Sequence, residues 1–315
     1  LELLSRLIDN FVDYSFPKES IKKELNIISQ ELAMNDDSYS VKAFKSLQKL
    51  MYKDSSVYVE TGGSKKSIKN INQEVLKQAT DHFYHPGNMY LVITGNFDVD
   101  EVLSMLKNHP FSKKKWSVHK DIKRTLDMSE KTKKMLIKKD KSLDTNIIEI
   151  GIKIPEAVFN NKDLEHGLLV NPFFSMINSP ASGLYKALKK RNLTNYSFQS
   201  SPIYDDDHGF FNISVETKKP KLFVKTIKEL LLEVPKLQFS EKVFSSYKKA
   251  DIGKAIRSFD GIKLAHYQIK RLLEDDLDIY NFVEKAKLVT YDDFKPYLDI
   301  FTKENIYIVQ YLKDA

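Results

Sequence analysis

Glu24 and Glu31 are the residues whose type and spacing best suit metal chemistry, in the stretch KESIKKELNIISQELAMND at 18–36. Pro17 and a run of good helix formers predict a helix here. At about 100° per residue, a seven-residue spacing brings the helix round to within roughly 20° of its starting direction. Both carboxylates are therefore expected on one face, inside an arc of isoleucines and leucines. A carboxylate facing a core is stabilised either by a buried ion pair or by a metal site, and the residues alone leave both alternatives open.

Histidines offer weaker candidates for metal ligands. His82 and His85 lie three residues apart near an expected helix end, a spacing that suits a metal ion. No third ligand is obvious beside them, so capping and packing are favoured for this pair. His208 follows three aspartates in YDDDHGF, where a solvated turn before a strand is favoured over a cation site.

Composition excludes several classes of protein. The 315 residues are 42% hydrophobic and 30% charged, as in a globular chain. No segment approaches the roughly 18 apolar residues of a membrane span. Cysteine is absent, which excludes disulfides and thiolate metal sites and suits a reducing cytoplasm. The net charge of +7 is concentrated in basic tracts at 111–124 and 131–141 that hold few aromatic residues. We expect a solvated linker there, with neither nucleic acid nor a membrane as partner.

Segments in the first half of the chain also resemble segments in the second half. GNMYLVITGNFD at 87–98 resembles ENIYIVQYLKD at 304–314, and both are expected to form strands. FPKESIKKELNIISQE resembles FSEKVFSSYKKADIGKA, and SYSVKAFKSL resembles SFDGIKLAHY, in the same order and at offsets of about 220 residues. The pattern predicts an α+β protein of two homologous domains, at 1–125 and 126–315, each with helices packed on a mostly antiparallel sheet.

The duplication has two implications. By comparison with the second copy, roughly the first 90 to 100 residues of the first copy are missing, so we expect a truncated or processed chain with an incomplete first domain. The repeat also maps Glu24 to Tyr247 and Glu31 to Lys254. A carboxylate pair present in one copy alone favours a functional role over a structural one.

Residue patterns predict the elements of each half. In the first half we expect a strand at 89–95 and helices at 1–14, 18–35, 39–52, 73–84 and 99–109. In the second half we expect strands within 133–154 and 196–217 and at the C-terminus, and helices near 162–177, 182–191, 220–233, 240–275 and 291–300.

Three segments together carry a family resemblance: ELNIISQELAMNDD, LMYKDSSVYVETGGSKKSIKNI and FYHPGNMYLVITGNFD. The chain resembles the pitrilysin/insulinase (M16) family of zinc metallopeptidases over nearly its whole length, and most of all the bacterial YmfH-like branch. ASGLYKALKKRNLTNYSF at 181–198 resembles the second half of that branch. The resemblance implies two LuxS/MPP-like metallohydrolase domains enclosing a peptide-binding chamber.

The family site combines two histidines of an HxxEH motif with a distal glutamate as zinc ligands. The resemblance implies that Glu31 is this glutamate and that Glu24 is a supporting carboxylate near the metal. None of the histidines lies in an HxxEH motif. The family spacing puts the motif about 44 residues upstream of Leu1. We therefore expect Zn²⁺ in the complete protein and no catalysis by this chain alone.

Larger members of the family use an Arg and a Tyr of the second domain to grip the substrate. Tyr196 and Arg191, or Lys189 in place of Arg191, are weak substrate-binding candidates here. The leading hypothesis is a zinc-dependent peptidase acting on peptides in a bacterial cytoplasm, as a homodimer or heterodimer with an M16-like protein. The alternative is a non-catalytic M16-like subunit that binds a peptide or a catalytic partner.

Overall fold

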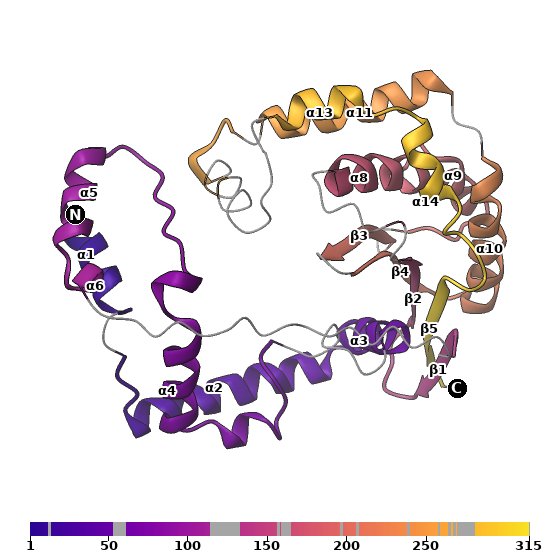
Figure 1. Cartoon of the computed structure of the whole chain (residues 1–315). Coiled ribbons are helices and arrows are strands. Elements are labelled where there is room, and N and C mark those ends of the chain that lie inside the picture. Colours follow the sequence, from indigo (N-terminus) through magenta and orange to yellow (C-terminus); the bar gives the residue numbers. More distant parts are fainter. Residues whose placement is uncertain are drawn as a thin grey trace.

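Figure 1 shows a computed structural model of the chain. It describes residues 1–11, 14–52, 61–113, 133–155, 158, 165–195, 198–205, 208–237, 240–257, 259–263, 266, 269 and 281–314. The helices are α1 (Glu2–Asp9), α2 (Lys18–Asp37), α3 (Tyr39–Met51), α4 (Gln73–Phe83), α5 (Val99–Asn108), α6 (Pro110–Lys113), α8 (Glu165–Asn178), α9 (Gly183–Lys190), α10 (Pro220–Leu232), α11 (Glu241–Arg257), α13 (Phe282–Leu288) and α14 (Lys295–Leu298). Short 3-10 turns lie at Ile68–Asn70, Pro86–Asn88, Val234–Lys236 and Asp292–Phe294.

One five-stranded sheet organises the second half of the chain. Its strands are β1 (Met135–Asp140), β2 (Asn146–Ile154), β3 (Gln199–Asp205), β4 (His208–Thr217) and β5 (Ile306–Lys313). Their spatial order is β1-β5-β2-β4-β3. β1 is parallel to β5, and the other three pairings are antiparallel. The predicted α+β class and the mostly antiparallel sheet are confirmed.

The main core lies between one face of this sheet and a layer of helices. Alternate β2 residues point into it, from Ile148 to Ile154, and all four are fully buried or nearly so. α8, α9, α10, α11 and α14 pack over that face (Figure 1). Aromatic rings fill the centre, where Phe173 lies 6.0 Å from Phe211 and 5.8 Å from Phe294 between ring centroids. Burial of these large apolar surfaces dominates the stability of the second half.

α3 covers the opposite face of the sheet, although it belongs to the first half of the chain. Its buried residues Ala43, Leu47 and Met51 pack against β2 and β5 (Figure 1). Gly151 permits the close approach, because a Cβ there would collide with Met51 Sδ and lie 3.3 Å from Leu47 Cδ1. The hydroxyl of Tyr39 also donates a hydrogen bond to Asp140 at 2.7 Å. The first half is thus fixed to the second by a helix that covers its sheet.

The other helices of the first half bury few apolar residues. α1 buries Ile8, α2 buries Leu32 and α5 buries Val102. α1, α5 and α6 lie away from the sheet, and α2 runs between them and α3 (Figure 1). Asn72 and Asp98 cap α4 and α5 by accepting backbone N–H bonds of 3.0 and 2.8 Å, which confirms the predicted helix starts.

The strand predicted at 89–95 is wrong for the structure as described. Met89 has extended angles (φ −137, ψ 148), but the segment pairs with no strand among the residues described. An extended segment becomes a strand only through hydrogen bonds to a neighbour, and here Tyr90 and Leu91 are exposed. The predicted boundary at 125/126 and most of the basic tract at 111–124 lie outside the described residues.

Candidate functional site

The candidate glutamates lie on α2, which follows Pro17 and ends before Ser38. Ser38 caps the next helix, since its hydroxyl accepts the Val41 N–H at 3.4 Å. α2 buries a single narrow side: Leu32 is buried, and Leu25 and Ile28 are half-buried. The packed side is thus much narrower than the apolar arc predicted from the sequence.

Glu24 and Glu31 are both exposed. Their apolar neighbours on the same side of α2 are exposed too, Ile27 to 40% and Met34 to 72%. On the helical wheel these four residues fall on one flank of the arc, and the packed residues fall on the other. The expectation that the carboxylates face a core is therefore wrong, because α2 contacts its neighbours through only part of its apolar surface.

Neither carboxylate has an ionic partner in the described part of the chain. The one ion pair that α2 makes there joins Asp36 to Lys65, with 3.6 Å between Oδ2 and Nζ. The first alternative from the sequence, a pair of buried ion pairs, therefore has no support in these residues. What the structure contains is two carboxylates on one exposed face with apolar side chains beside them.

A complete metal site is absent from the described residues, which hold no group of three or more His, Asp or Glu side chains placed around one ion. The two α2 carboxylates therefore do not fit a zinc site by themselves, because structural and catalytic zinc sites take at least three protein ligands. Glu31 can supply at most one ligand, and no catalytic step follows from this chain's residues alone.

The histidines have structural surroundings. His82 lies against Phe83, with ring centroids 4.6 Å apart, and His85 is buried, which agrees with packing roles for both.

His109 is buried beside Asp9, at 3.4 Å between Nε2 and Oδ1. His208 is also buried, with its ring 5.3 Å from that of Tyr52. The predicted solvated environment of His208 is thus wrong, because α3 brings Tyr52 over the start of β4.

The substrate-binding candidates of the second half are not brought to α2. Arg191 is exposed at the C-terminal end of α9, and Lys189 is exposed in its last turn. α9 belongs to the helix layer, whereas α2 lies beyond α3 on the other side of the sheet (Figure 1). Tyr196 lies outside the described residues.

A further carboxylate, that of Glu149, has a raised pKa that the residue pattern did not predict. Glu149, on β2, is only 3% exposed, on the sheet face that α3 covers. Asn212 Nδ2 donates to one of its oxygens at 2.9 Å, and the Ser214 hydroxyl donates to the other at 2.6 Å. Burial raises the pKa of Glu149 to about 7, against the opposing effect of these two hydrogen bonds. In NIIEIGIKI the alternation places Glu149 opposite the isoleucines, which by itself indicates a solvent-facing side chain.

Lys153 lies on the same face, four residues further along β2. Its Nζ donates to the Met51 carbonyl at 3.4 Å and lies 4.8 Å from the centroid of the Tyr52 ring. Burial lowers the pKa of Lys153. Glu149 is thus buried and Lys153 half-buried on the face that α3 covers, which sequence reasoning about β2 in isolation could not detect.

Comparison with known proteins places these features in a family. Residues 70–250 match the model described as "Peptidase M16 inactive domain". An uncharacterized zinc protease YmfH of Bacillus subtilis is 26% identical over 295 residues, which are 92% of this chain and 68% of that protein. An uncharacterized zinc protease of Rickettsia felis is 30% identical over 104 residues, covering 33% of this chain and 24% of its own length.

Solved structures show the same fold. A putative M16-like peptidase from Alicyclobacillus acidocaldarius superposes with a TM-score of 0.76 at 20% identity, covering 98% of this chain and 74% of its own. Pitrilysin superposes with a TM-score of 0.74 at 17% identity, over 98% of this chain and 34% of its own. Within the described part of the chain, no helix is both long and apolar enough to cross a membrane.

Proposed function

The chain belongs to the peptidase M16 family, and from this premise we propose that it is part of a zinc-dependent peptidase to which it contributes the metal ligand Glu31. The observation that supports this proposal is the α2 face, where Glu24 and Glu31 are exposed without an ionic partner among the described residues. A carboxylate without a competing cation is available as an oxygen ligand for a metal ion.

Other parts of the protein must complete the site. The 315 residues contain no HxxEH motif. In this proposal, the two histidines and the catalytic base come from outside them and meet Glu31 across the exposed α2 face. Bound zinc would supply an activated water for peptide hydrolysis. Glu31 would bind the metal, and Glu24, two turns earlier on the same face, would orient one of the ligands or balance the charge of the metal.

A second candidate function rests on a different observation. The matching family model is that of an inactive domain, and no metal site is formed by the described residues. The chain would then belong to a non-catalytic M16-like subunit, which holds a peptide or a catalytic partner without cleaving. A cytoplasmic location and pairing with an M16-like protein are part of both proposals.

Cleavage of a fluorescence-quenched peptide library by the full-length protein separates the two functions. For the zinc peptidase, we expect cleavage that a metal chelator abolishes and added Zn²⁺ restores. Glu31→Gln should lose this cleavage, whereas Glu19→Gln, an exposed glutamate in the first turn of α2, should retain it. Peptide binding without cleavage under every condition would instead establish the non-catalytic subunit.

A further inference from the structure

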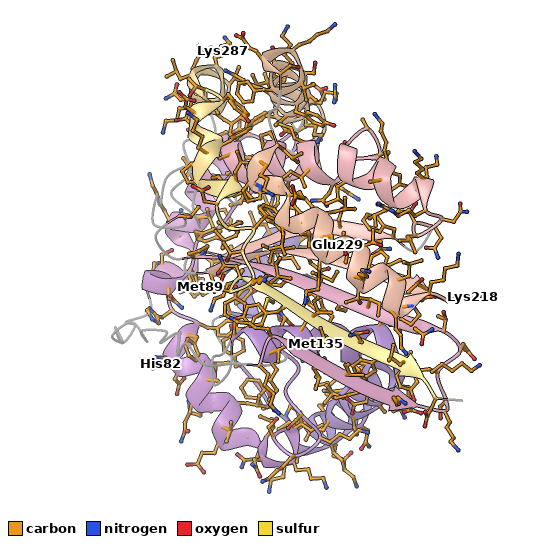
Figure 2. All side chains as sticks on the ribbon, turned by 90° about the vertical axis from the view of Figure 1, so that its right-hand side faces the viewer. His82, Met89, Met135, Lys218, Glu229 and Lys287 are labelled. Carbon is orange, nitrogen blue, oxygen red and sulfur yellow. The ribbon has the colours of Figure 1, made fainter. Side chains whose placement is uncertain are left out.

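A basic surface lies where the end of α9 meets the start of α10. We define the α9–α10 basic surface by six exposed residues, Lys189, Lys190, Arg191, Lys218, Lys219 and Lys221. Figure 2 shows the side of the molecule that carries α10, with Lys218 at the edge where this helix begins.

Packing of the two helices explains why these charges point outward. α9 buries Leu184 and Leu188, and α10 buries Phe223, Val224 and Ile227 against the sheet. Lys189, Lys190 and Lys221 lie on the exposed sides of these helices, so burial of the apolar faces directs them to solvent. Arg191, Lys218 and Lys219 are exposed at the helix ends.

A hydrogen bond holds the two groups of charges together. After α9 the chain turns at Asn192, whose φ is 53°. Asn195, three residues later, donates from Nδ2 to the Glu216 carbonyl at 2.9 Å. Glu216 lies two residues before Lys218, so this bond places the end of α9 beside the start of α10. The fold therefore determines the backbone positions of these basic residues.

These charges lack neutralising partners in the part of the chain that is described. None of the six takes part in an ion pair there. α9 has no acidic residue, and the acidic residue of α10, Glu229, lies toward its other end (Figure 2). Glu233, just beyond α10, is paired with Lys236 at 2.9 Å. Positive charge is thus concentrated at one end of the helix pair, where it attracts anions.

We propose that the α9–α10 basic surface binds an anionic lipid surface. Five of its six residues are lysines, whose flexible, point-like charges suit a diffuse layer of headgroups, whereas specific phosphate recognition favours arginine. Leu222 is 46% exposed among these lysines and can enter the interface between headgroups and acyl chains. Such binding is peripheral and needs no membrane-spanning helix. It departs from the expectation, based on the basic tracts at 111–124 and 131–141, that a membrane is not a partner.

Nucleic acid fits this surface less well. Single strands are held by exposed aromatic rings, and the aromatic residues of these helices are not available for stacking. Tyr185 is half-buried with its ring edge-on to Phe198 at 5.6 Å, and Phe223 is fully buried. The surface also holds a single arginine, the residue that most often reads base edges.

Vesicle co-sedimentation of the full-length protein tests the proposal. Vesicles of phosphatidylcholine mixed with phosphatidylglycerol should bind the protein, binding should weaken as salt rises, and pure phosphatidylcholine should not bind it. The triple variant Lys218→Glu, Lys219→Glu, Lys221→Glu should lose more than about 100-fold in affinity, because the loss of each basic residue costs about fivefold and the reversal of its charge adds to that cost. The milder triple variant with Gln at the same three positions should fall between this variant and the wild type.

A matched control separates local from net charge. Lys23→Glu, Lys69→Glu, Lys107→Glu changes the net charge equally at exposed positions on α2, in the 3-10 turn before α4 and on α5. This control should keep most of the wild-type binding. The proposal would be overturned if the control and the Lys218→Glu, Lys219→Glu, Lys221→Glu variant lost equal affinity for the vesicles. It would also be overturned if the wild type did not bind at low salt, or if it bound duplex DNA more tightly than the vesicles and this triple variant abolished the DNA binding. The readout does not involve peptidase activity, so it is independent of the proposed function.

Discussion

Replacing Glu149 by Gln should change how the stability of the protein depends on pH. The carboxyl of Glu149 is buried under α3, and its pKa rises from 4.5 to about 7 in the folded state. The folded state therefore favours the protonated carboxyl. Its contribution to stability is fully present below pH 4.5 and is lost as the pH rises toward and through 7. At about 1.4 kcal/mol per pKa unit, the loss amounts to at most roughly 3 kcal/mol.

The amide side chain introduced by Glu149→Gln is neutral at every pH and retains an oxygen that can accept from Asn212 or Ser214. Near pH 4.5, the ordinary pKa of the carboxyl, the variant and the wild type should be almost equally stable. Near pH 8 the variant should be more stable by up to roughly 3 kcal/mol, since the wild type must then bury a charge. Effects of other titrating groups are common to both proteins and cancel in the difference.

Urea unfolding followed by circular dichroism at several pH values measures this difference. Glu229→Gln is the matched control, because Glu229 is exposed on α10. It should shift the unfolding free energy by little at any pH. A stability difference for Glu149→Gln that stays constant between pH 5 and 8, or that favours the wild type at high pH, would refute the assigned burial of a carboxyl under α3.

The remaining predictions concern packing and capping. Gly151→Ala should destabilise the protein by about 1–3 kcal/mol in urea unfolding, because the added Cβ collides with Met51. Adding Met51→Ala to the same chain should recover part of this loss of stability. Strictly additive effects of the two substitutions on the unfolding free energy would contradict the contact. Asn72→Ala should lower the unfolding free energy by about 1 kcal/mol, because the hydrogen bond from the Val75 N–H to the capping side chain is lost. Lys69→Ala is the control and should leave the stability unchanged. Equal effects of the two substitutions would argue against capping by Asn72.

Helix positions and the sheet of the second half follow from local patterns. The caps at Asn72 and Asp98 and the alternating apolar residues of β2 each specify their own element. Those signals need no partner from elsewhere in the chain, so the α+β class and most element positions could be predicted. The family followed from three short segments taken together.

Contacts between distant segments account for what sequence reasoning missed. The extended segment near Tyr90 has strand composition but no partner strand among the described residues. Glu149 has the pattern of a surface residue, but it is buried on the sheet face that α3, some hundred residues away in sequence, covers. Glu31 was expected to be buried, because a helical wheel shows which residues share a face but not how much of that face is covered. Each of these errors concerns the segment that packs against a helix or strand, which the local pattern of that helix or strand does not specify.

Zinc affinity of the full-length protein tests the central claim most directly. Equilibrium titration should show zinc binding by the wild type and a loss of more than about 100-fold in Glu31→Gln, since a direct ligand is removed. Glu24→Gln should lose about 10–100-fold, as expected for a supporting carboxylate, and Glu19→Gln should match the wild type. Unchanged zinc affinity in Glu31→Gln, or a wild-type protein that binds no zinc, would contradict the assignment of Glu31 as a metal ligand.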